Sequence, residues 1–559
     1  MAKKDLQKEQ EKMEENDQKK QAHDIATEVE KSEKFLTLRE SNTLLYFDPE
    51  TGQYVEGESY LNRLVREITI SNYSKYIFGE ILAMVKVDTF IDTRDFTCPI
   101  PWINLLNGAF NLSTGEFVPR SKKPENKQVE KRVVELETKQ KLQLDKINEE
   151  EKKKLKDLKE STEDALDRIE IEMDVLKNFR KKRSKVQMNF AELIQKEKSK
   201  LNLEIRKWKD DQINAFGKFN FTSTIPVKFD PDAECSKIDA FFHQVQNGYD
   251  NVRRLYELAG YCLWKEYTIK RFVIFVGDHD TGKSTTTRLL TIFLGDENVS
   301  GLSMEAMIDD KFDRIKLHDR LANISGELAP HFLKDTSLIK ELTGRDPISV
   351  RLMHSQQDFK FVNYAKLIFL ANQIPSTYEN DGGYFSRTEI WEFENQFATG
   401  STMKENILNE IATESELSGL FNKSVEALRE LLKNGKFTAS RTAEEKKKEY
   451  MIRANPFKVY TENRIGLHWD YPGEHEEDDF IIKKGDLFED SLEFCKNNKI
   501  EPWTMQSFFR LMNNYLLKFG IKGKRLSSNG PEIYPGIYFK EHVQTEKPNE
   551  DSKNYIDDL

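Results

Sequence analysis

Hydrophobic residues recur at helical spacing over a long stretch in the first half of the chain. From about residue 122 to 216, apolar positions follow each other every three or four residues between lysines and glutamates, and neither proline nor glycine occurs between Pro124 and Gly217. This pattern predicts a coiled coil or a long helical hairpin, and the hairpin is favoured because globular sequence resumes on both sides. The polar stretches Glu149–Lys154 and Arg180–Lys185 are candidates for its turn. The apolar stripe consists of Val129, Val133, Leu136, Leu144, Ile147, Leu155, Leu158, Leu166, Ile169, Met173, Leu176, Val186, Phe190, Leu193, Leu201, Ile205 and Trp208.

A second pattern, the five consecutive apolar residues from Phe272 to Val276, predicts a buried strand. The segment that follows, Gly277 to Ser284, has the form G-x-x-x-x-G-K-[ST], and apolar residues at helical spacing continue from there. Glycines in such a loop let backbone N–H groups converge on a phosphate, and the helix adds the positive end of its dipole. The sequence therefore predicts a nucleoside triphosphate site, in which Lys283 reaches the β- and γ-phosphates and the Ser284 hydroxyl holds Mg²⁺. The predicted contacts are Gly277, Asp278, His279, Asp280, Thr281, Gly282, Lys283, Ser284 and Thr285.

Polar residues at the ends of further predicted strands are candidates for the chemistry. Glu327 follows the apolar segment 320–325 and is the candidate acid that polarises the attacking water and helps to hold the metal. Asn372 follows a strand over 365–371 and could bind the γ-phosphate or the water. Arg387 precedes another apolar strand and is the candidate arginine finger for a neighbouring subunit. Each also has an ordinary interpretation: a surface glutamate, a helix cap or turn asparagine, and an exposed salt-bridging arginine.

Composition narrows the class of protein. The 559 residues carry a net charge of −10 and four scattered cysteines, without the spacing of a zinc site or a disulfide framework. This cysteine usage is typical of a reducing cytoplasm, which is the expected location. The charged N-terminus does not resemble a signal peptide, and no apolar run reaches the length of a membrane span, so no membrane partner is expected. Because the total charge is acidic, any surface that binds nucleic acid has to be local.

The order of these motifs resembles that of superfamily 3 helicases, and within them the helicase half of phage, plasmid and poxvirus primase–helicases. The resemblance covers about residues 40–121 and 219–460, with the predicted coiled coil as an insertion. The segments that carry it are Gly277–Ser284, Ser325–Leu328, Leu338–Ile348, Phe369–Asn372, Arg387, Ile103–Gly115, Ile225–Ala233, Gly260–Tyr261, Glu416–Leu420 and Asn434–Thr438.

This resemblance implies an α/β P-loop (AAA+-like) ATPase core with a parallel central sheet and an α+β helicase-associated domain before it. It also implies a homo-hexamer that hydrolyses ATP with Mg²⁺ and moves along single-stranded and forked DNA during replication of a virus, phage or plasmid. Residues 348–362 would then be a β-hairpin that lines the central pore, and their alternating pattern favours a hairpin independently. The candidate DNA contacts, each of which could also be a solvated surface residue, are Lys340, Arg351, His354 and Lys360.

The chain departs from the family pattern in three places. No second acid follows Glu327 closely, which leaves the coordination of Mg²⁺ open. Ser386 and Arg387 stand where many relatives carry paired arginines. The residues before about 40 are too few for a primase domain, so primer synthesis is not expected.

The residues from 505 to 540 contain six basic residues and one acid, and they resemble a winged-helix DNA-binding domain. The run from Phe508 to Lys518 would be its recognition helix, and strands around Gly530-Pro531 would form the wing. A winged helix that contacts only protein is the alternative. The candidate DNA contacts are Arg510, Lys522, Lys524 and Arg525.

The patterns together predict seven segments. They are a charged tail (1–34), the helicase-associated domain (35–121 and 217–265), the coiled-coil insertion (122–216), the ATPase core (266–395), its helical C-terminal part (396–465), a winged-helix-like domain (480–541) and an acidic tail (542–559). The leading hypothesis is an ATP-dependent DNA helicase, with a replication partner bound through the coiled coil or the acidic tail. Two alternatives stay open: a P-loop motor that remodels or packages another substrate, with the coiled coil gripping a protein, and a coiled-coil scaffold whose ATPase switches its conformation. The insertion could also be a solvated spacer.

Overall fold

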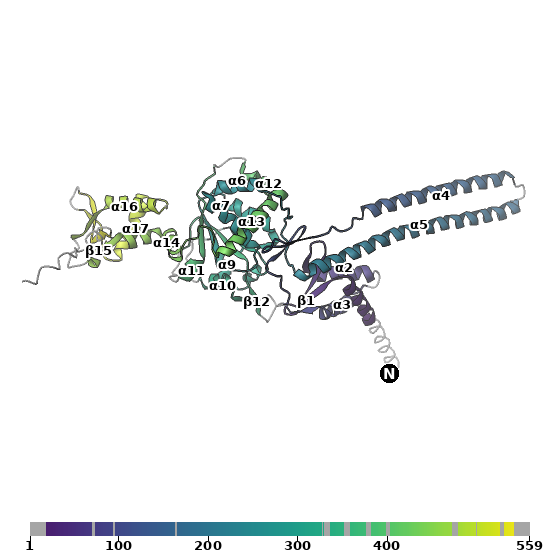
Figure 1. Ribbon diagram of the computed structural model, residues 1–559, viewed down its shortest axis with the longest axis horizontal. Coiled ribbons are helices and arrows are strands. Elements are labelled where there is room, and N and C mark those ends of the chain that lie inside the picture. Colours follow the sequence, from purple (N-terminus) through teal and green to yellow (C-terminus); the bar gives the residue numbers. More distant parts are fainter. Residues whose placement is uncertain are drawn as a thin grey trace, which may run out of the picture. The chain divides into compact units, whose positions relative to one another are not determined.

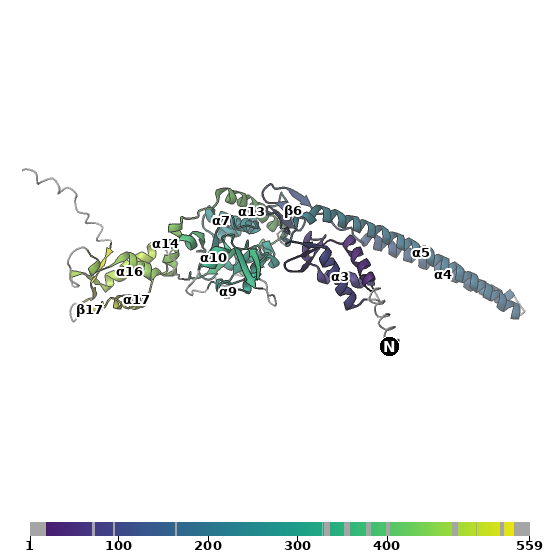
Figure 2. The same ribbon diagram turned by 90° about the horizontal axis from the view of Figure 1, so that it is seen from below.

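The computed structural model describes residues 18–69, 73–92, 95–161, 165–326, 328, 336–351, 358–375, 382–397, 403–471, 479–498, 500–525 and 530–540. The chain divides into two units, Met1–Asp230 and Pro231–Leu559, whose elements are labelled in Figure 1 and Figure 2. It is a mixed α/β protein with a five-stranded parallel sheet in the second unit and a helix of 52 residues in the first. Among the helices that the structure describes, none is long and apolar enough to cross a membrane.

The first unit is built around a four-stranded sheet in the order β3-β2-β1-β4, in which β1 pairs antiparallel with β2 and parallel with β4. A helix over residues 18–32 and the helices α2 and α3 bury their apolar faces in one core with this sheet. A second sheet, β5-β6-β7, is antiparallel throughout. The bounds are β1 Phe35–Leu38, β2 Thr43–Asp48, β3 Gln53–Glu56, α2 Glu58–Thr69, α3 Lys75–Asp88, β4 Phe90–Ile91, β5 Trp102–Leu105, β6 Gly108–Asn111 and β7 Phe117–Pro119.

The charged segment 1–34 is expected from the sequence to be a frayed helix or disorder, and within it residues 18–32 form a helix. The buried face of this helix consists of Ala22, Ile25, Ala26 and Val29. These positions have the i, i+3, i+4, i+7 spacing of a single helix face. The surrounding lysines and glutamates dominate the composition and mask this short stripe in the sequence. Residues 1–17 lie outside the described part of the chain.

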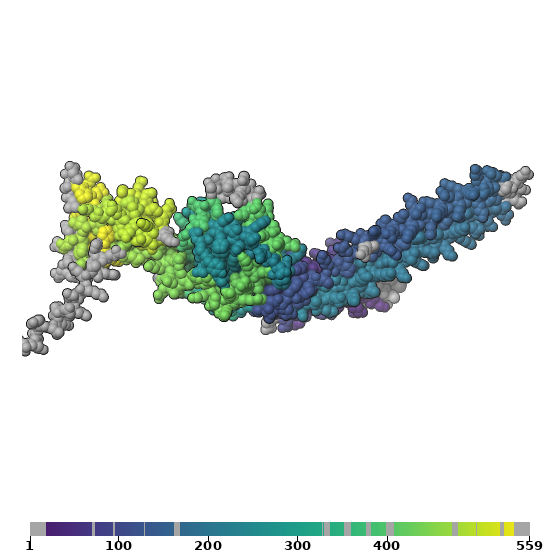
Figure 3. Space-filling model, turned by 45° about the horizontal axis from the view of Figure 1, so that its top comes forward, coloured from purple at the N-terminus to yellow at the C-terminus, as the bar shows by residue number. Residues whose placement is uncertain are grey.

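The predicted coiled coil is a helical hairpin of α4 (Lys127–Ser161) and α5 (Ala165–Phe216). The two helices run side by side in both ribbon views, and their surfaces adjoin in Figure 3. Both turn candidates are wrong, because Glu149–Lys154 lies within α4 and Arg180–Lys185 lies within α5. They face each other inside the hairpin instead: Arg183 Nη1 donates to Asn148 Oδ1 at 3.0 Å and pairs with Glu151. An antiparallel pair brings such polar runs together because residue numbers rise along one helix and fall along the other.

Most of the predicted apolar stripe forms the seam between these helices. Its members on α4 are half-buried, and Phe190, Leu201 and Trp208 on α5 are buried. The prediction is wrong for Ile169, Met173, Leu176 and Leu193, which are 44–67% exposed. In these parts of α5 the side chains that pack against α4 are Val175, Phe179 and Ile194, which follow the same three- and four-residue spacing. Periodicity alone cannot choose between two such series, because the partner helix decides which one is covered.

The chain returns from the hairpin to the unit that it left, as expected for an insertion. Trp208 Nε1 donates to the Ser121 carbonyl at 3.0 Å and Gln212 Nε2 to Ser121 Oγ at 2.7 Å, which closes the base of the hairpin. Beyond it, Asn104 Nδ2 in β5 donates to Thr224 Oγ1 at 2.7 Å. The segments before and after the insertion therefore pack as one layer.

The sheet of the second unit has the order β14-β8-β13-β10-β9, and each neighbouring pair is parallel. Every residue of β8 and β13 is buried, as expected for central strands that are covered on both faces. The antiparallel pair β11/β12 stands apart from this sheet. The bounds are β8 Phe272–Val276, α8 Lys283–Leu294, β9 Val299–Ser300, α9 Met304–Asp309, β10 Ala322–Ser325, α10 Ser337–Leu342, β11 Pro347–Arg351, β12 Asp358–Val362, β13 Lys366–Ala371, α11 Gly382–Arg387, β14 Thr388–Glu392, α12 Met403–Ile411 and α13 Glu414–Asn434.

The boundary between the units lies at residue 230, whereas the expected domain boundary lies at 265. The helices α6 (Ser236–Val245) and α7 (Tyr249–Leu263) belong to the second unit, where α7 packs against α13. The two helices approach closely at Gly260, because a Cβ there would lie 2.1 Å from the Ser424 carbonyl oxygen. Only the part of 217–265 up to residue 230 stays with the N-terminal unit.

The end of the second unit has a core of its own, to which α15, α16 and α17 contribute buried aromatic and aliphatic residues. A three-stranded antiparallel sheet, β16-β18-β17, completes it. From α15 onward the order is therefore helix, strand, helix, helix, strand, strand, with the short pair β15/β19 at its base. The bounds are α14 Ala443–Ala454, α15 Pro456–Arg464, β15 Ile465–Leu467, β16 Ile481–Lys483, α16 Lys484–Asn497, α17 Met505–Leu517, β17 Lys524–Arg525, β18 Glu532–Pro535 and β19 Ile537–Phe539.

Candidate functional site

The glycine-rich loop lies between the end of β8 and the first residue of α8. Each of the two glycines of its motif is required for a different structural reason. Gly282 has φ +89°, and a Cβ there would lie 2.5 Å from Val245 Cγ1. Gly277 has no room for a side chain, because a Cβ would lie 2.3 Å from the Phe393 carbonyl oxygen. Asp280 also has a positive φ, of 61°. The loop therefore turns sharply enough to present backbone groups and the start of α8 to the same space.

Lys283, the first residue of α8, is folded back over the loop. Its Nζ donates to the carbonyls of Gly277 and Asp278, both at 2.6 Å, and to Thr281 Oγ1 at 3.3 Å. The side chain is only 8% exposed, and this burial lowers the pKa of Lys283, against the opposing effect of the Asp278 carboxylate. The lysine is thus a nearly buried cation that is held by neutral carbonyl acceptors beside a cavity.

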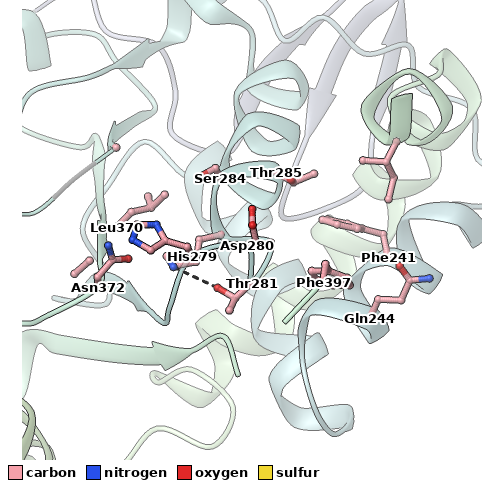
Figure 4. Close-up of a pocket in the computed structure, with 15 residues that line it drawn as sticks. Phe241, Gln244, His279, Asp280, Thr281, Ser284, Thr285, Leu370, Asn372 and Phe397 are labelled. Atoms are coloured by element: carbon pink, nitrogen blue, oxygen red, sulfur yellow. Dashed lines mark hydrogen bonds between the residues drawn. The ribbon is translucent and has the colours of Figure 1, made fainter. Parts of the chain in front are cut away.

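That cavity has a volume of about 460 Å³, which is within the range of small-molecule sites. The loop and the start of α8 form its floor, and Figure 4 shows His279 and Asn372 on one side and Phe241 and Phe397 on the other. Its lining residues are Phe241, Gln244, His279, Asp280, Thr281, Gly282, Lys283, Ser284, Thr285, Gly326, Leu370, Ala371, Asn372, Phe397 and Ile407. The predicted loop residues from His279 to Thr285 are thus brought together, whereas Gly277 and Asp278 do not line the cavity.

The strand order explains how residues far apart in the sequence reach this cavity. β13 lies between β8 and β10, so Asn372, at the end of β13, stands beside the loop. Gly326, directly after β10, lines the same cavity. The carboxyl ends of parallel strands meet at one edge of the sheet, where α/β proteins bind ligands. Glu327, the next residue, lies outside the described part of the chain.

Arg387 does not line this cavity. It immediately precedes β14, whose Thr388 pairs with Phe272 and whose Glu392 pairs with Val276. The parallel register therefore puts Arg387 about 16 Å along the strands from the level of Val276, the last residue before the loop, at the amino ends of the strands. Its Nη1 donates to the Gly383 carbonyl at 2.8 Å, while its Nε is buried and has no hydrogen-bond partner among the described residues.

The candidate pore residues come from a helix and from a pair of strands. Lys340 is on α10, whereas Arg351 and Lys360 are exposed on the antiparallel pair β11/β12. The segment thus forms the expected hairpin, with Ser349 opposite Lys360. His354 lies outside the described residues.

The basic residues predicted for the winged-helix-like domain are all exposed. Arg510 is on α17, Lys522 precedes β17, and Lys524 and Arg525 form that strand. Arg525 Nε lies 3.5 Å from Glu532 on β18, so part of this positive charge is neutralised within the β17/β18 pair.

The apolar wall of the cavity was not predicted. Phe241 comes from α6, as does the polar Gln244 beside this wall, while Phe397 follows β14 and Ile407 comes from α12. The Phe397 N–H donates to the Asp280 carbonyl at 3.0 Å, which ties this wall to the loop. These residues carry no motif, and an apolar helix face is indistinguishable from ordinary core in the sequence.

The residues at the cavity fit a magnesium ion only together with a phosphate ligand. Ser284 supplies one hydroxyl, and among the described residues no cluster of three His, Cys, Asp or Glu side chains could hold a metal. Mg²⁺ keeps several waters and is commonly bound through few protein ligands and substrate phosphates.

Comparisons with known proteins give limited similarity. Residues 275–388 match the model of a family of unknown function, DUF5906, a segment that runs from β8 to the start of β14. No curated protein matches the chain in sequence. An apo structure of the NrS-1 C-terminal region is 11% identical and covers 58% of this chain and 88% of that chain, with a TM-score of 0.32. A second structure of that region is 16% identical over 57% of this chain and 79% of that chain, with a TM-score of 0.31. TM-scores of this size do not establish a common fold.

Proposed function

We propose that this chain is an ATP-dependent DNA helicase that works as a ring of subunits, a hexamer, in the replication of a mobile genetic element. The observation that carries the proposal is the cavity in which the glycine-rich loop, the buried Lys283 and Asn372 from the adjacent strand meet. Backbone groups at a helix start, a lysine and an amide are the groups with which P-loop enzymes bind and sense phosphates.

The proposal gives separate roles to the polar residues that approach the phosphates. The start of α8 and Lys283 bind the β- and γ-phosphates of ATP. A phosphate is a charged acceptor, so it competes well with the two neutral carbonyls that Lys283 contacts at 2.6 Å. Ser284 holds Mg²⁺, which neutralises phosphate charge when bound. Asn372 contacts the γ-phosphate or the attacking water, and Glu327, on the strength of its position in the sequence, polarises that water.

The ring is supported by the position of Arg387. At the edge of the sheet opposite to its own loop, this arginine cannot reach the nucleotide of its own subunit. A head-to-tail contact between subunits brings one edge of the sheet in one copy against the other edge in the next, and such contacts close into rings. Arg387 therefore stabilises the transferring phosphate in a neighbouring subunit.

DNA is the proposed track because two exposed basic features accompany the ATPase unit. The β11/β12 hairpin carries Arg351 and Lys360 on its exposed face, as expected for a pore loop that contacts a phosphate backbone. The order of elements from α15 to β18 is that of a winged helix, with α17 in the place of the recognition helix.

The test is ATP hydrolysis by the full chain with and without single-stranded DNA. We expect DNA to stimulate hydrolysis, and Lys283→Ala to lower the rate by at least a hundredfold because the phosphates lose their buried cation. DNA binding, measured by fluorescence anisotropy, should survive the substitution. Thr291→Ala, on the same helix away from the cavity, is the matched control and should keep the activity.

Strand displacement on duplexes with a 3′ or a 5′ single-stranded tail then separates a helicase from other motors. Unwinding of one tailed substrate supports the proposal and gives the direction of movement. Hydrolysis that is indifferent to DNA would contradict it and would favour a motor for another substrate.

A further inference from the structure

The helical hairpin carries a band of positive charge. Lys152–Lys156 on α4 contains four lysines and no acid, and Lys177–Lys185 on α5 contains six basic residues and no acid. We refer to these two runs together as the basic band. It stands out because the whole chain has a net charge of −10.

The register of the hairpin places the two runs side by side. Arg183 pairs with Glu151 and Lys182 lies 4.0 Å from Glu150, so these positions of α4 and α5 lie opposite each other. Toward the turn, numbers rise on α4 and fall on α5, which brings Lys152–Lys156 next to the first half of Lys177–Lys185. The charges therefore gather on one section of the hairpin.

Most of these charges have no counterion among the residues that the structure describes. Arg183 and Lys182 contact glutamates of α4, as described above. The other eight side chains form no ion pair with any residue that the structure describes. They are Lys152, Lys153, Lys154, Lys156, Lys177, Arg180, Lys181 and Lys185, and all eight are exposed. Like charges this close repel each other, so an external anion would relieve the repulsion.

The surface around the band favours nucleic acid over protein as that anion. Within the two runs the apolar residues, Leu155 and Phe179, point into the seam, and the exposed residues are all basic or small and polar. Protein interfaces have an apolar core, which the two runs lack, since the exposed Leu176 and Met188 lie outside them. The phosphate backbone, in contrast, is bound mainly through lysine and arginine charges.

The spacing of the lysines also suits a regular chain of phosphates. Lys177, Lys181 and Lys185 follow each other at four-residue intervals, which places them on one face of α5 about 6 Å apart along the helix. A lysine acts as a flexible point charge, so such a row binds successive phosphates without reading their bases.

We infer that the hairpin is a DNA-binding arm, whose basic band holds the sugar–phosphate backbone without sequence preference. This surface is separate from the proposed pore hairpin and winged helix. The choice of DNA over RNA rests on the proposed function, but the binding of a phosphate backbone does not.

The experiment uses the full chain and two matched triple variants of α5. One is Lys177→Gln/Lys181→Gln/Lys185→Gln in the band, and the control is Lys196→Gln/Lys198→Gln/Lys200→Gln, which removes the same charge from exposed positions of the same helix. Anisotropy titrations with a labelled single strand and a labelled duplex, from 50 to 200 mM salt, give the affinity and its salt dependence. We expect the band variant to bind about tenfold more weakly at low salt, with a slope of log K against log salt smaller by about 2–3 because three phosphate contacts are lost. The control should change by less than twofold.

A photo-crosslinking residue at Ser184 in the band or at Ser199 outside it, both exposed, reports contact directly. We expect labelled DNA to crosslink at Ser184 and not at Ser199, with or without ATP and also in Lys283→Ala. Equal weakening of both triple variants, or crosslinking at both serines, would reduce the effect to net charge and overturn the inference. Displacement of DNA by poly-L-glutamate at equal charge would overturn it in favour of an acidic protein partner. Loss of DNA-stimulated hydrolysis with crosslinking retained would contradict only the helicase proposal.

Discussion

Two buried lysines in the second unit, Lys283 and Lys366, differ in whether their surroundings leave room for a ligand. Lys283 lies beside a cavity of about 460 Å³, so a ligand can take over its hydrogen bonds. Lys366, the first residue of β13, is 2% exposed and donates to the carbonyls of Trp264 and Tyr364 at 2.6 and 2.7 Å. Its Nζ also lies 4.5 Å from the ring centroid of Tyr261. Burial lowers the pKa of Lys366 to about 7.

This lowered pKa predicts a stability that rises with pH. Between about pH 7 and the ordinary lysine pKa of 10.5, the unfolded chain binds a proton at Lys366 that the folded chain lacks. The free energy of unfolding should therefore increase by about 1.4 kcal/mol per pH unit in this window from this group alone. In Lys366→Met that contribution disappears. Urea unfolding of both proteins at pH 7.5, 8.5 and 9.5 should show the difference growing in favour of the wild type.

Lys360→Met is the control for this measurement, because Lys360 is exposed on β12. Its difference from the wild type should be the same at all three pH values. A pH-independent difference for Lys366→Met as well would mean that Lys366 stays charged in the folded protein.

Elements could be predicted from the sequence where a local pattern specifies them. They were missed where the structure depends on a packed neighbouring element. The strand, loop and helix from Phe272 to Leu294 follow from a run of apolar residues, a glycine motif and helical spacing, and they are observed. The turn of the hairpin was misplaced, because polar runs are typical both of turns and of polar layers within a coiled coil. Only the facing helix, with Glu151 opposite Arg183, distinguishes the two.

That polar layer gives a prediction at the level of the hairpin. Glu151 is 8% exposed, so Arg183→Ala leaves a nearly buried carboxylate without its partner, at a cost of about 1–3 kcal/mol. Hydrogen exchange of peptides from the middle of α4 and α5, measured in the full chain, should become faster. The double variant Arg183→Leu/Glu151→Leu should restore or exceed the original protection, since it makes the apolar seam continuous.

Lys182→Ala is the matched control, since its contact with Glu150 is 4.0 Å long and both side chains are more than half exposed. Such surface pairs contribute little, so exchange should be almost unchanged. Equal effects of Arg183→Ala and Lys182→Ala would show that the buried pair stabilises the hairpin no more than the exposed pair does.

At the scale of the whole molecule, the sheet separates two halves of the proposed active site. The loop, Lys283 and Asn372 lie at the carboxyl edge of the sheet, and Arg387 lies at the amino edge. The sequence could name the loop and these three residues, because each follows or precedes an apolar strand. It could not give the strand order, which depends on crossovers, or the apolar wall with Phe241 and Phe397, which carries no motif.

This separation predicts that two inactive variants restore each other. Lys283→Ala disables the loop and Arg387→Ala disables the finger, so each protein alone should hydrolyse ATP poorly. When the two are mixed during assembly, a subunit with an intact loop can meet a neighbour with an intact Arg387, and about a quarter of the sites should recover. ATPase assays across mixing ratios should peak near equal amounts. A mixture that stays as inactive as its components would place Arg387 outside the active site.

The closed base of the hairpin has a consequence for its length. Trp208 and Gln212 hydrogen-bond to Ser121, so the two ends of the insertion are joined at the base of the hairpin. The contacts at this base do not depend on the parts of α4 and α5 that lie farther out. Adding one heptad to both helices keeps the seam in phase and moves the outer part of the hairpin about 10 Å away from its base. Deleting one heptad moves it about 10 Å closer. The number of heptads between this base and the basic band therefore sets the distance at which the hairpin presents its positive charge.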